Sequence, residues 1–181
     1  MVAYHEWLSL TRMTGLAAYT ASLLACVWRW AKCREIEASR GLYAMLALVQ
    51  FCLLLDMAFN WRWKLHDLGV EMATKLGVYD LRRTPQLLVL LALALALALL
   101  SALIFYRLRR RIGVALALTG TLLSMGLWCL ECISLHAVDR VLYRLIGVVM
   151  TVSLAWIFLA LVTCLGVWLD FSRHPAASLP R

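Results

Sequence analysis

Histidine and carboxylate side chains at helical spacing are the residues of this chain best suited to hold a metal ion. His136 and Asp139 are three residues apart, a spacing that places two ligands on one face in metal-binding helical bundles. His66 lies in a polar stretch, residues 60–86, that separates two long apolar runs. These three residues are candidate ligands of a transition metal, whereas haem is not expected because no histidine lies in the middle of an apolar run.

Acidic residues within the apolar segments are the next candidates for chemistry. Asp56 and Glu131 lie inside or at the edge of such segments, and a charge in hydrocarbon is costly unless it is paired or hydrated. Glu131, or Glu71 in the polar stretch, is a candidate general base. The alternative is an ion pair that locks helices together, such as Asp56 with Arg62 or Glu131 with Arg140.

A third group of side chains suits an anionic ligand. Arginine binds carboxylate or phosphate through paired hydrogen bonds, and neighbouring amide and phenol groups add further hydrogen-bonding positions. The candidate ligand-binding residues are Asp56, Asn60, Arg62, Tyr79, Arg82, Arg83 and Arg140. For Arg82 and Arg83 the alternative is contact with lipid head groups.

The polar stretch has the pattern of an amphipathic helix. One apolar stripe, at steps of three or four residues, contains Trp61, Leu65, Leu68, Met72 and Leu76. Charged residues follow another face, where Glu71 and Lys75 form a favourable i,i+4 pair. We therefore expect a helix over about residues 60–79 that lies in the membrane interface, with the stripe in the lipid.

The end of the fourth apolar run carries a second polar group. If its helix continues to about residue 140, one stripe along it contains Cys129, Cys132, His136 and Asp139. Because position 66 is about 140° from position 61 on a helix, we expect the inner edge of the interfacial helix to close over the outward end of the bundle, with His66 turned towards His136 and Glu131. Cys129 and Cys132 also form a C-x-x-C pair, but a redox role would need a second outward cysteine pair, which the six cysteines do not supply. The alternative is that these cysteines are small packing residues.

The composition indicates a membrane protein. The 181 residues are 64% hydrophobic with a mean hydropathy of +0.83, whereas soluble domains are roughly 45–50% apolar. Five runs are long enough to cross a bilayer, at about 12–31, 41–59, 87–106, 112–134 and 145–170. The predicted fold is an all-α, polytopic bundle of transmembrane helices. A single membrane domain covers residues 1–172, and a disordered polar tail follows over 173–181.

Charge predicts the orientation and the partners. The net charge is +8, but the basic residues flank apolar runs and no nucleic-acid-binding motif is present, so the lipid bilayer is the expected partner rather than nucleic acid. The tight cluster "RLRRR" (107–111) is expected to stay in the cytoplasm. That places the N-terminus outside and the C-terminus inside, in what we expect to be a bacterial inner membrane.

Three functional hypotheses follow from these features. The first is a small accessory or binding subunit, with a protein partner or a homo-oligomer, whose outward polar residues hold a partner, metal or anionic ligand. The second is a membrane-embedded, metal-dependent enzyme that acts on an anionic or lipid substrate. The third is an oligomeric channel or transporter with a pore lined by Gln50 and Asp56. We find no P-loop, G-x-S-x-G, H-E-x-x-H or Rossmann motif that would favour an enzyme.

Overall fold

The computed structural model describes residues 10–33, 37–77, 81, 83–133 and 135–173. Within these ranges, five helices are long and apolar enough to cross a membrane, as predicted: α1 (Leu10–Lys32), α2 (Glu37–Phe59), α4 (Arg83–Arg107), α5 (Ile112–Ile133) and α7 (Thr151–Arg173). The shorter elements are the helices α3 (Trp61–Lys75) and α6 (His136–Leu142) and a hairpin of β1 (Leu145–Ile146) and β2 (Val149–Met150). The chain is an all-α, multi-pass membrane protein.

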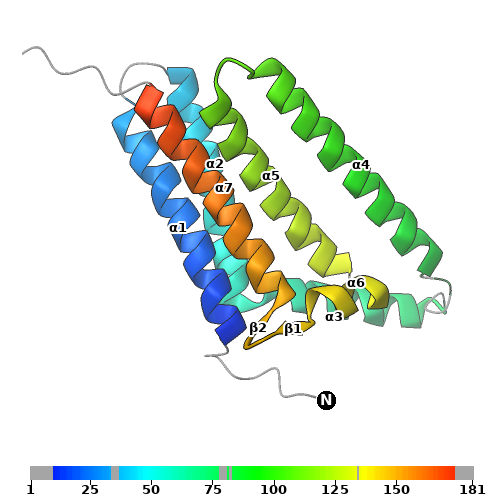
Figure 1. Cartoon of the computed structure of the whole chain (residues 1–181). Coiled ribbons are helices and arrows are strands. Elements are labelled where there is room, and N and C mark those ends of the chain that lie inside the picture. The colour runs from blue at the N-terminus through cyan, green and yellow to red at the C-terminus, as the bar shows by residue number, and fades with distance from the viewer. Residues whose placement is uncertain (1–9, 34–36, 78–80, 82, 134, 174–181) are drawn as a thin grey trace, which may run out of the picture.

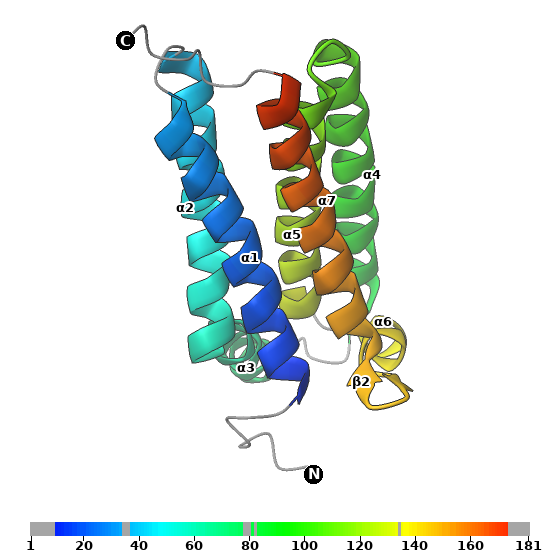
Figure 2. The ribbon, with the colours of Figure 1, turned by 60° about the vertical axis from the view of Figure 1, so that its left-hand side comes forward.

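The spanning helices form a bundle of four with a fifth helix at its side. Helices α1, α2, α5 and α7 pack together, and α4 contacts this bundle along α5 (Figures 1 and 2). No residue of α4 is buried, so the Leu/Ala-rich helix presents most of its surface to lipid. Helix α3 runs across one end of the bundle, which we call the α3 end (Figure 1). Residues 107–111 lie at the opposite end, which we call the basic-loop end.

Small residues let α5 and α7 approach each other closely. At Gly113 and Gly166, an added Cβ atom would collide with the backbone of the other helix. Helices in lipid associate through such close packing, because the hydrophobic effect does not drive them together there. Gln50 of α2 adds a hydrogen bond across the interior, with its Nε2 3.1 Å from Thr121 Oγ1 of α5. The core of the bundle is therefore close-packed and partly polar.

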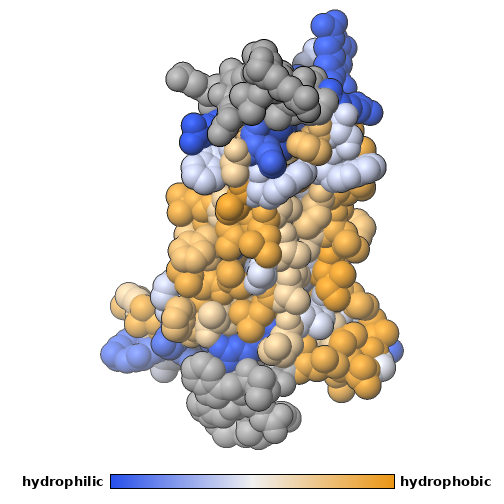
Figure 3. Space-filling model, turned by 90° about the vertical axis from the view of Figure 1, so that its left-hand side faces the viewer, coloured by the Kyte–Doolittle hydropathy of each residue, from blue (hydrophilic) through white to orange (hydrophobic). Residues whose placement is uncertain are grey.

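The surface matches a protein embedded in a bilayer. On the face that Figure 3 shows, the spanning helices form an apolar band, with polar residues gathered at both ends. The predicted apolar stripe on α3 is confirmed, because all five of its members are exposed. On another face of α3, Lys75 Nζ lies 2.6 Å from Glu71 Oε1, which is the predicted i,i+4 pair. Helix α3 therefore has the two faces that an interfacial helix needs.

The end of α5 differs from the sequence expectation. The helix ends at Ile133, Leu135 is extended with φ −104° and ψ 126°, and a separate helix begins at His136. The predicted stripe of Cys129, Cys132, His136 and Asp139 along one helix is therefore wrong. A change of backbone direction at Leu135 separates the two cysteines from the two possible ligands.

The start of the fifth span also differs. Helix α7 begins at Thr151 rather than near residue 145, because Gly147, with φ 67°, turns the preceding residues into a hairpin. The interfacial helix ends at Lys75, shortly before Gly77, which has the same left-handed φ of 67°. The last residues of its predicted range, and the predicted tail beyond Arg173, lie outside the described residues.

Candidate functional site

One buried arginine anchors α3 to the bundle. Arg62 is 3% exposed and is the only buried residue of α3, every residue of which the structure describes. The helix follows a sharp turn at Asn60, whose φ of 54° is a left-handed conformation that asparagine tolerates better than most residues. This turn folds α3 back across the bundle, and the Arg62 side chain enters between α2 and α5.

Asp56, near the end of α2, holds the start of α3. Its Oδ1 accepts a hydrogen bond from the Arg62 backbone N–H at 2.8 Å, and its Oδ2 lies 3.2 Å from Arg62 Nε. Asn60 occupies the N-cap position without a side-chain cap bond, so Asp56 satisfies a free N–H group of the first turn instead. Of the alternatives that the sequence left open for Asp56, the structure contains the ion pair with Arg62.

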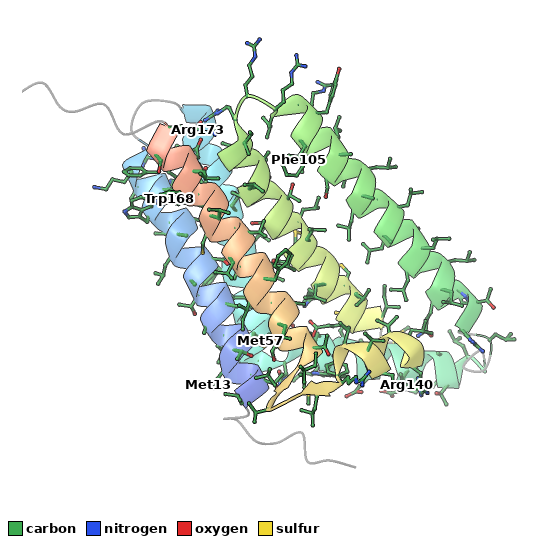
Figure 4. All side chains as sticks on the ribbon, viewed as in Figure 1. Met13, Met57, Phe105, Arg140, Trp168 and Arg173 are labelled. Atoms are coloured by element: carbon green, nitrogen blue, oxygen red, sulfur yellow. The ribbon has the colours of Figure 1, made fainter. Side chains whose placement is uncertain are left out.

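Glu131, near the end of α5, is the second partner of the arginine. Its Oε2 lies 2.5 Å from Arg62 Nη1, so its partner is Arg62 rather than the predicted Arg140. Arg62 Nη2 lies 2.9 Å from Met57 Sδ, and the Trp156 ring lies under the guanidinium at 5.4 Å. Figure 4 labels Met57 and Arg140 at the α3 end of the molecule, where Met57 is buried and Arg140 is exposed. Sequence alone did not reveal this partner, because the choice depends on how α3 crosses α5.

Asp56, Arg62 and Glu131 form what we call the Arg62 cluster, and all three side chains are at least 95% buried. Burial by itself lowers the pKa of the Arg62 guanidinium, but the pKa is raised overall, because Glu131, Asp56 and Tyr19 all favour the charged form. The Arg62 guanidinium is therefore charged at neutral pH. Glu131 is buried and paired with Arg62. This arrangement suits a structural ion pair, whereas a general base must be accessible to its substrate.

A cavity lies beside this cluster, between α3, α4 and α5. Its volume is about 330 Å³, near the lower limit of the ~300–1,000 Å³ typical of small-molecule sites. Its walls are mostly apolar, and the lining residues with polar side chains are His66, Gln86 and Cys132. Gln86 Nε2 donates a hydrogen bond to the Ile133 carbonyl at 3.1 Å, which fixes the first turn of α4 to the last turn of α5. The predicted candidate His66 therefore faces this cavity.

The remaining metal candidates lie on α6. His136 is exposed and Asp139 is half-buried, and both belong to a helix that follows the break at Leu135. Among the residues that the structure describes, no three His, Cys, Asp or Glu side chains form a group that would hold a metal ion. The prediction of a site built from His66, His136 and Asp139 therefore gains no support from the geometry.

The other predicted site residues are separated from the cluster. Glu71 is exposed and paired with Lys75 on the water-facing side of α3. Arg83, the first residue of α4, and Arg140 are both exposed. Tyr79 and Arg82 lie outside the described residues. The structure thus gathers Asp56, Arg62 and Glu131 into one site and leaves the exposed candidates on the surface around it.

Comparison with protein-family models, with curated proteins and with solved structures gave no match. A function for this chain is therefore argued from its geometry. The α3 end of the molecule combines the Arg62 cluster with the neighbouring cavity.

The sequence reasoning missed a second buried ion cluster, at the basic-loop end. Asp170 Oδ2 lies 2.9 Å from Arg29 Nη2 and 2.9 Å from the Tyr43 hydroxyl, and its Oδ1 lies 3.7 Å from Arg111 Nη2. Arg111 also donates a hydrogen bond to Ser39 Oγ at 3.1 Å. We call Arg29, Tyr43, Arg111 and Asp170 the Asp170 cluster. The sequence did contain a signal for this pair. Arg29 lies near the end of the first apolar run and Asp170 near the end of the fifth, and the predicted topology places both ends on the same side of the membrane.

Proposed function

We propose that this protein is a non-catalytic binding subunit of a bacterial inner membrane, with its α3 end facing outward. The observation that carries the proposal is the engagement of Arg62 by both buried carboxylates. The acidic groups best placed for chemistry hold α3 in position, and α3 in turn forms one wall of the adjacent cavity. The cluster is thus the support of a binding site rather than its reactive part.

The cavity is the proposed binding site. Leu65, Val70 and Val89 provide apolar surface, and His66 of α3 and Gln86 of α4 provide hydrogen-bonding atoms. A cavity with this lining suits an apolar or amphipathic molecule that enters from the lipid between α3 and α4. The outward orientation is supported by the dense basic loop, which resists translocation across the membrane.

Filling the cavity tests the binding proposal. Gly69 and Ala73 both line the cavity, and an added Cβ at Gly69 meets no atom within 4 Å. We expect Gly69→Leu/Ala73→Leu to fold and to lose a small molecule or protein that co-purifies with the wild type from native membranes. The matched control is Gly41→Leu, which also adds a side chain in open space but lies far from the cavity. Mass spectrometry that finds the same companions in all three proteins, or none in any, would remove the basis of the proposal.

Thiol labelling tests the orientation separately. Lys64 and Arg109 are both exposed, on α3 and in the basic loop respectively. In a background lacking Cys33, whose thiol pKa is raised by burial, an impermeant reagent added outside intact cells should label Lys64→Cys but not Arg109→Cys. The reverse pattern would place the α3 end in the cytoplasm.

A further inference from the structure

An apolar hairpin projects from the α3 end, where polar residues otherwise gather. Leu145, Ile146 and Val148 are 63%, 52% and 79% exposed, and Val141 of α6 is exposed beside them. Figure 3 shows an apolar area at this end of the molecule, next to polar residues. Several adjacent exposed hydrophobic side chains indicate contact with a membrane or a protein.

The hairpin is a defined element rather than a frayed helix end. Leu145 pairs with Met150 and Ile146 with Val149, and Gly147 has the left-handed φ of 67° that the turn requires. Thr151, the first residue of α7, closes the base, because its N–H and its hydroxyl both donate to the Arg144 carbonyl, at 2.9 and 3.1 Å. The hydrophobic side chains are therefore held outward by backbone geometry.

The length of α7 sets the depth of the hairpin. Its 23 residues span about 34 Å at ~1.5 Å per residue, slightly more than the ~30 Å hydrocarbon core. The turn at Gly147 is four residues from Thr151, so it extends at most ~13 Å beyond the helix. The polar layer on each side of a bilayer is roughly 5–8 Å thick. The hairpin therefore lies within or just beyond the head-group layer.

The charge of this segment matches an anionic surface. Residues 140–150 contain two arginines, Arg140 and Arg144, and no acidic residue. Both arginine side chains are exposed. The hairpin is also linked to α3, because the Tyr143 and Trp63 rings lie 5.8 Å apart. The exposed stripe of α3 and the hairpin thus lie at the same end of the molecule.

We propose that the hairpin is a second interfacial anchor that binds anionic phospholipid. Leu145, Ile146 and Val148 pack among the head groups, and Arg140 and Arg144 bind lipid phosphates. A basic residue near an anionic surface strengthens membrane association about fivefold. This anchor does not depend on the proposed cavity, so the failure of one leaves the other intact.

Depth measurement by spin labelling tests the anchor. In a cysteine-free protein in nanodiscs that contain phosphatidylglycerol, a label at Val148→Cys should show a ratio of collisions with oxygen to collisions with a water-soluble nickel chelate that lies between the ratios of a lipid-facing and a water-facing label. Leu68→Cys, on the exposed apolar stripe of α3, is the lipid-facing control, and Lys64→Cys is the water-facing control. If the collision ratio of the Val148→Cys label equals that of Lys64→Cys, the hairpin lies in water and the proposed anchor is wrong. The exposed side chains of Leu145, Ile146 and Val148 would then be a protein-docking surface.

Varying the lipid charge tests the two arginines. The Val148→Cys label should lie deeper with phosphatidylglycerol than with phosphatidylcholine alone. In Arg140→Gln/Arg144→Gln this dependence on lipid charge should disappear, while the label stays in the lipid. An equal depth in both lipids for the protein with its native arginines would overturn the binding of anionic lipid.

Discussion

The two buried ion clusters have opposite compositions and join different parts of the molecule. In the Arg62 cluster, one guanidinium lies between two carboxylates, whereas in the Asp170 cluster one carboxylate lies between two guanidiniums. The Asp170 cluster connects spanning helices with each other and with the residue that precedes α5. The Arg62 cluster connects spanning helices with α3, which has no other buried residue.

This difference indicates that buried ion pairs have two roles in this protein, which are to stabilise the bundle and to position α3. Loss of the Asp170 cluster removes contacts between helices that also pack through close approach and apolar surface. Loss of the Arg62 cluster removes the only buried attachment of α3. The first cluster should therefore contribute mainly to the stability of the bundle, and the second to the position of α3.

The largest loss of stability is expected for Asp170→Ala. The variant leaves the Arg29 guanidinium, 4% exposed, without a carboxylate, and arginine cannot relieve that cost by losing its proton. We expect the free energy of unfolding to fall by about 3–5 kcal/mol, measured by reversible denaturation in detergent micelles. Asp67→Ala, which removes an exposed carboxylate of α3, is the control. Equal stability of the two variants would mean that the Asp170 cluster does not hold the bundle.

A smaller, pH-dependent loss is expected for Arg62→Ala. The variant leaves Asp56 and Glu131 buried without a cation, but a carboxylate, unlike a guanidinium, can be neutralised by a proton. We expect a loss of about 3 kcal/mol at pH 8 and a smaller loss at pH 5, measured in the same way. The exposed Arg83→Ala should have little effect at either pH. If the loss of unfolding free energy in Arg62→Ala were larger at pH 5 than at pH 8, the cost would not come from charged Asp56 and Glu131, and this explanation would be wrong.

The smallest change is expected for Asp56. In Asp56→Ala, Arg62 keeps Glu131 as a partner, so the loss is that of one ion-pair contact and one helix cap, about 1–3 kcal/mol. Asp56→Asn should cost less, because the amide oxygen can still accept the hydrogen bond of the Arg62 N–H. If Asp56→Asn lowers the free energy of unfolding as much as Asp56→Ala does, the charge of Asp56 contributes the stability rather than the helix cap.

Much of the fold could be predicted from local sequence, because the length of an apolar run and the period of an apolar stripe are local properties. The five spans and the exposed face of α3 follow from them. The errors arose where one residue changed the backbone direction. Gly147 turned the expected start of the last span into a hairpin, and the extended Leu135 separated α6 from α5.

The candidate site was only partly predictable, because ion-pair partners are chosen by tertiary packing. Asp56 and Arg62 are six residues apart across one turn, and their pairing could be considered from sequence. Arg29 and Asp170 are separated by 141 positions, and nothing local connects them. On α3, Arg62 and His66 share a face, but the shape of the bundle decided that Arg62 enters it and that His66 faces the cavity.

The central claim is that Arg62 fixes α3 to the bundle, and a distance measurement tests it most directly. Spin labels at Lys75→Cys on α3 and Leu161→Cys on the lipid-facing side of α7 report the position of α3, since both residues are exposed. Pulsed electron resonance should give one narrow distance in the otherwise native protein and in Asp56→Asn. In folded Arg62→Ala the distribution should broaden. A distribution for folded Arg62→Ala as narrow as in the native protein would show that other contacts hold α3 and would contradict the claim.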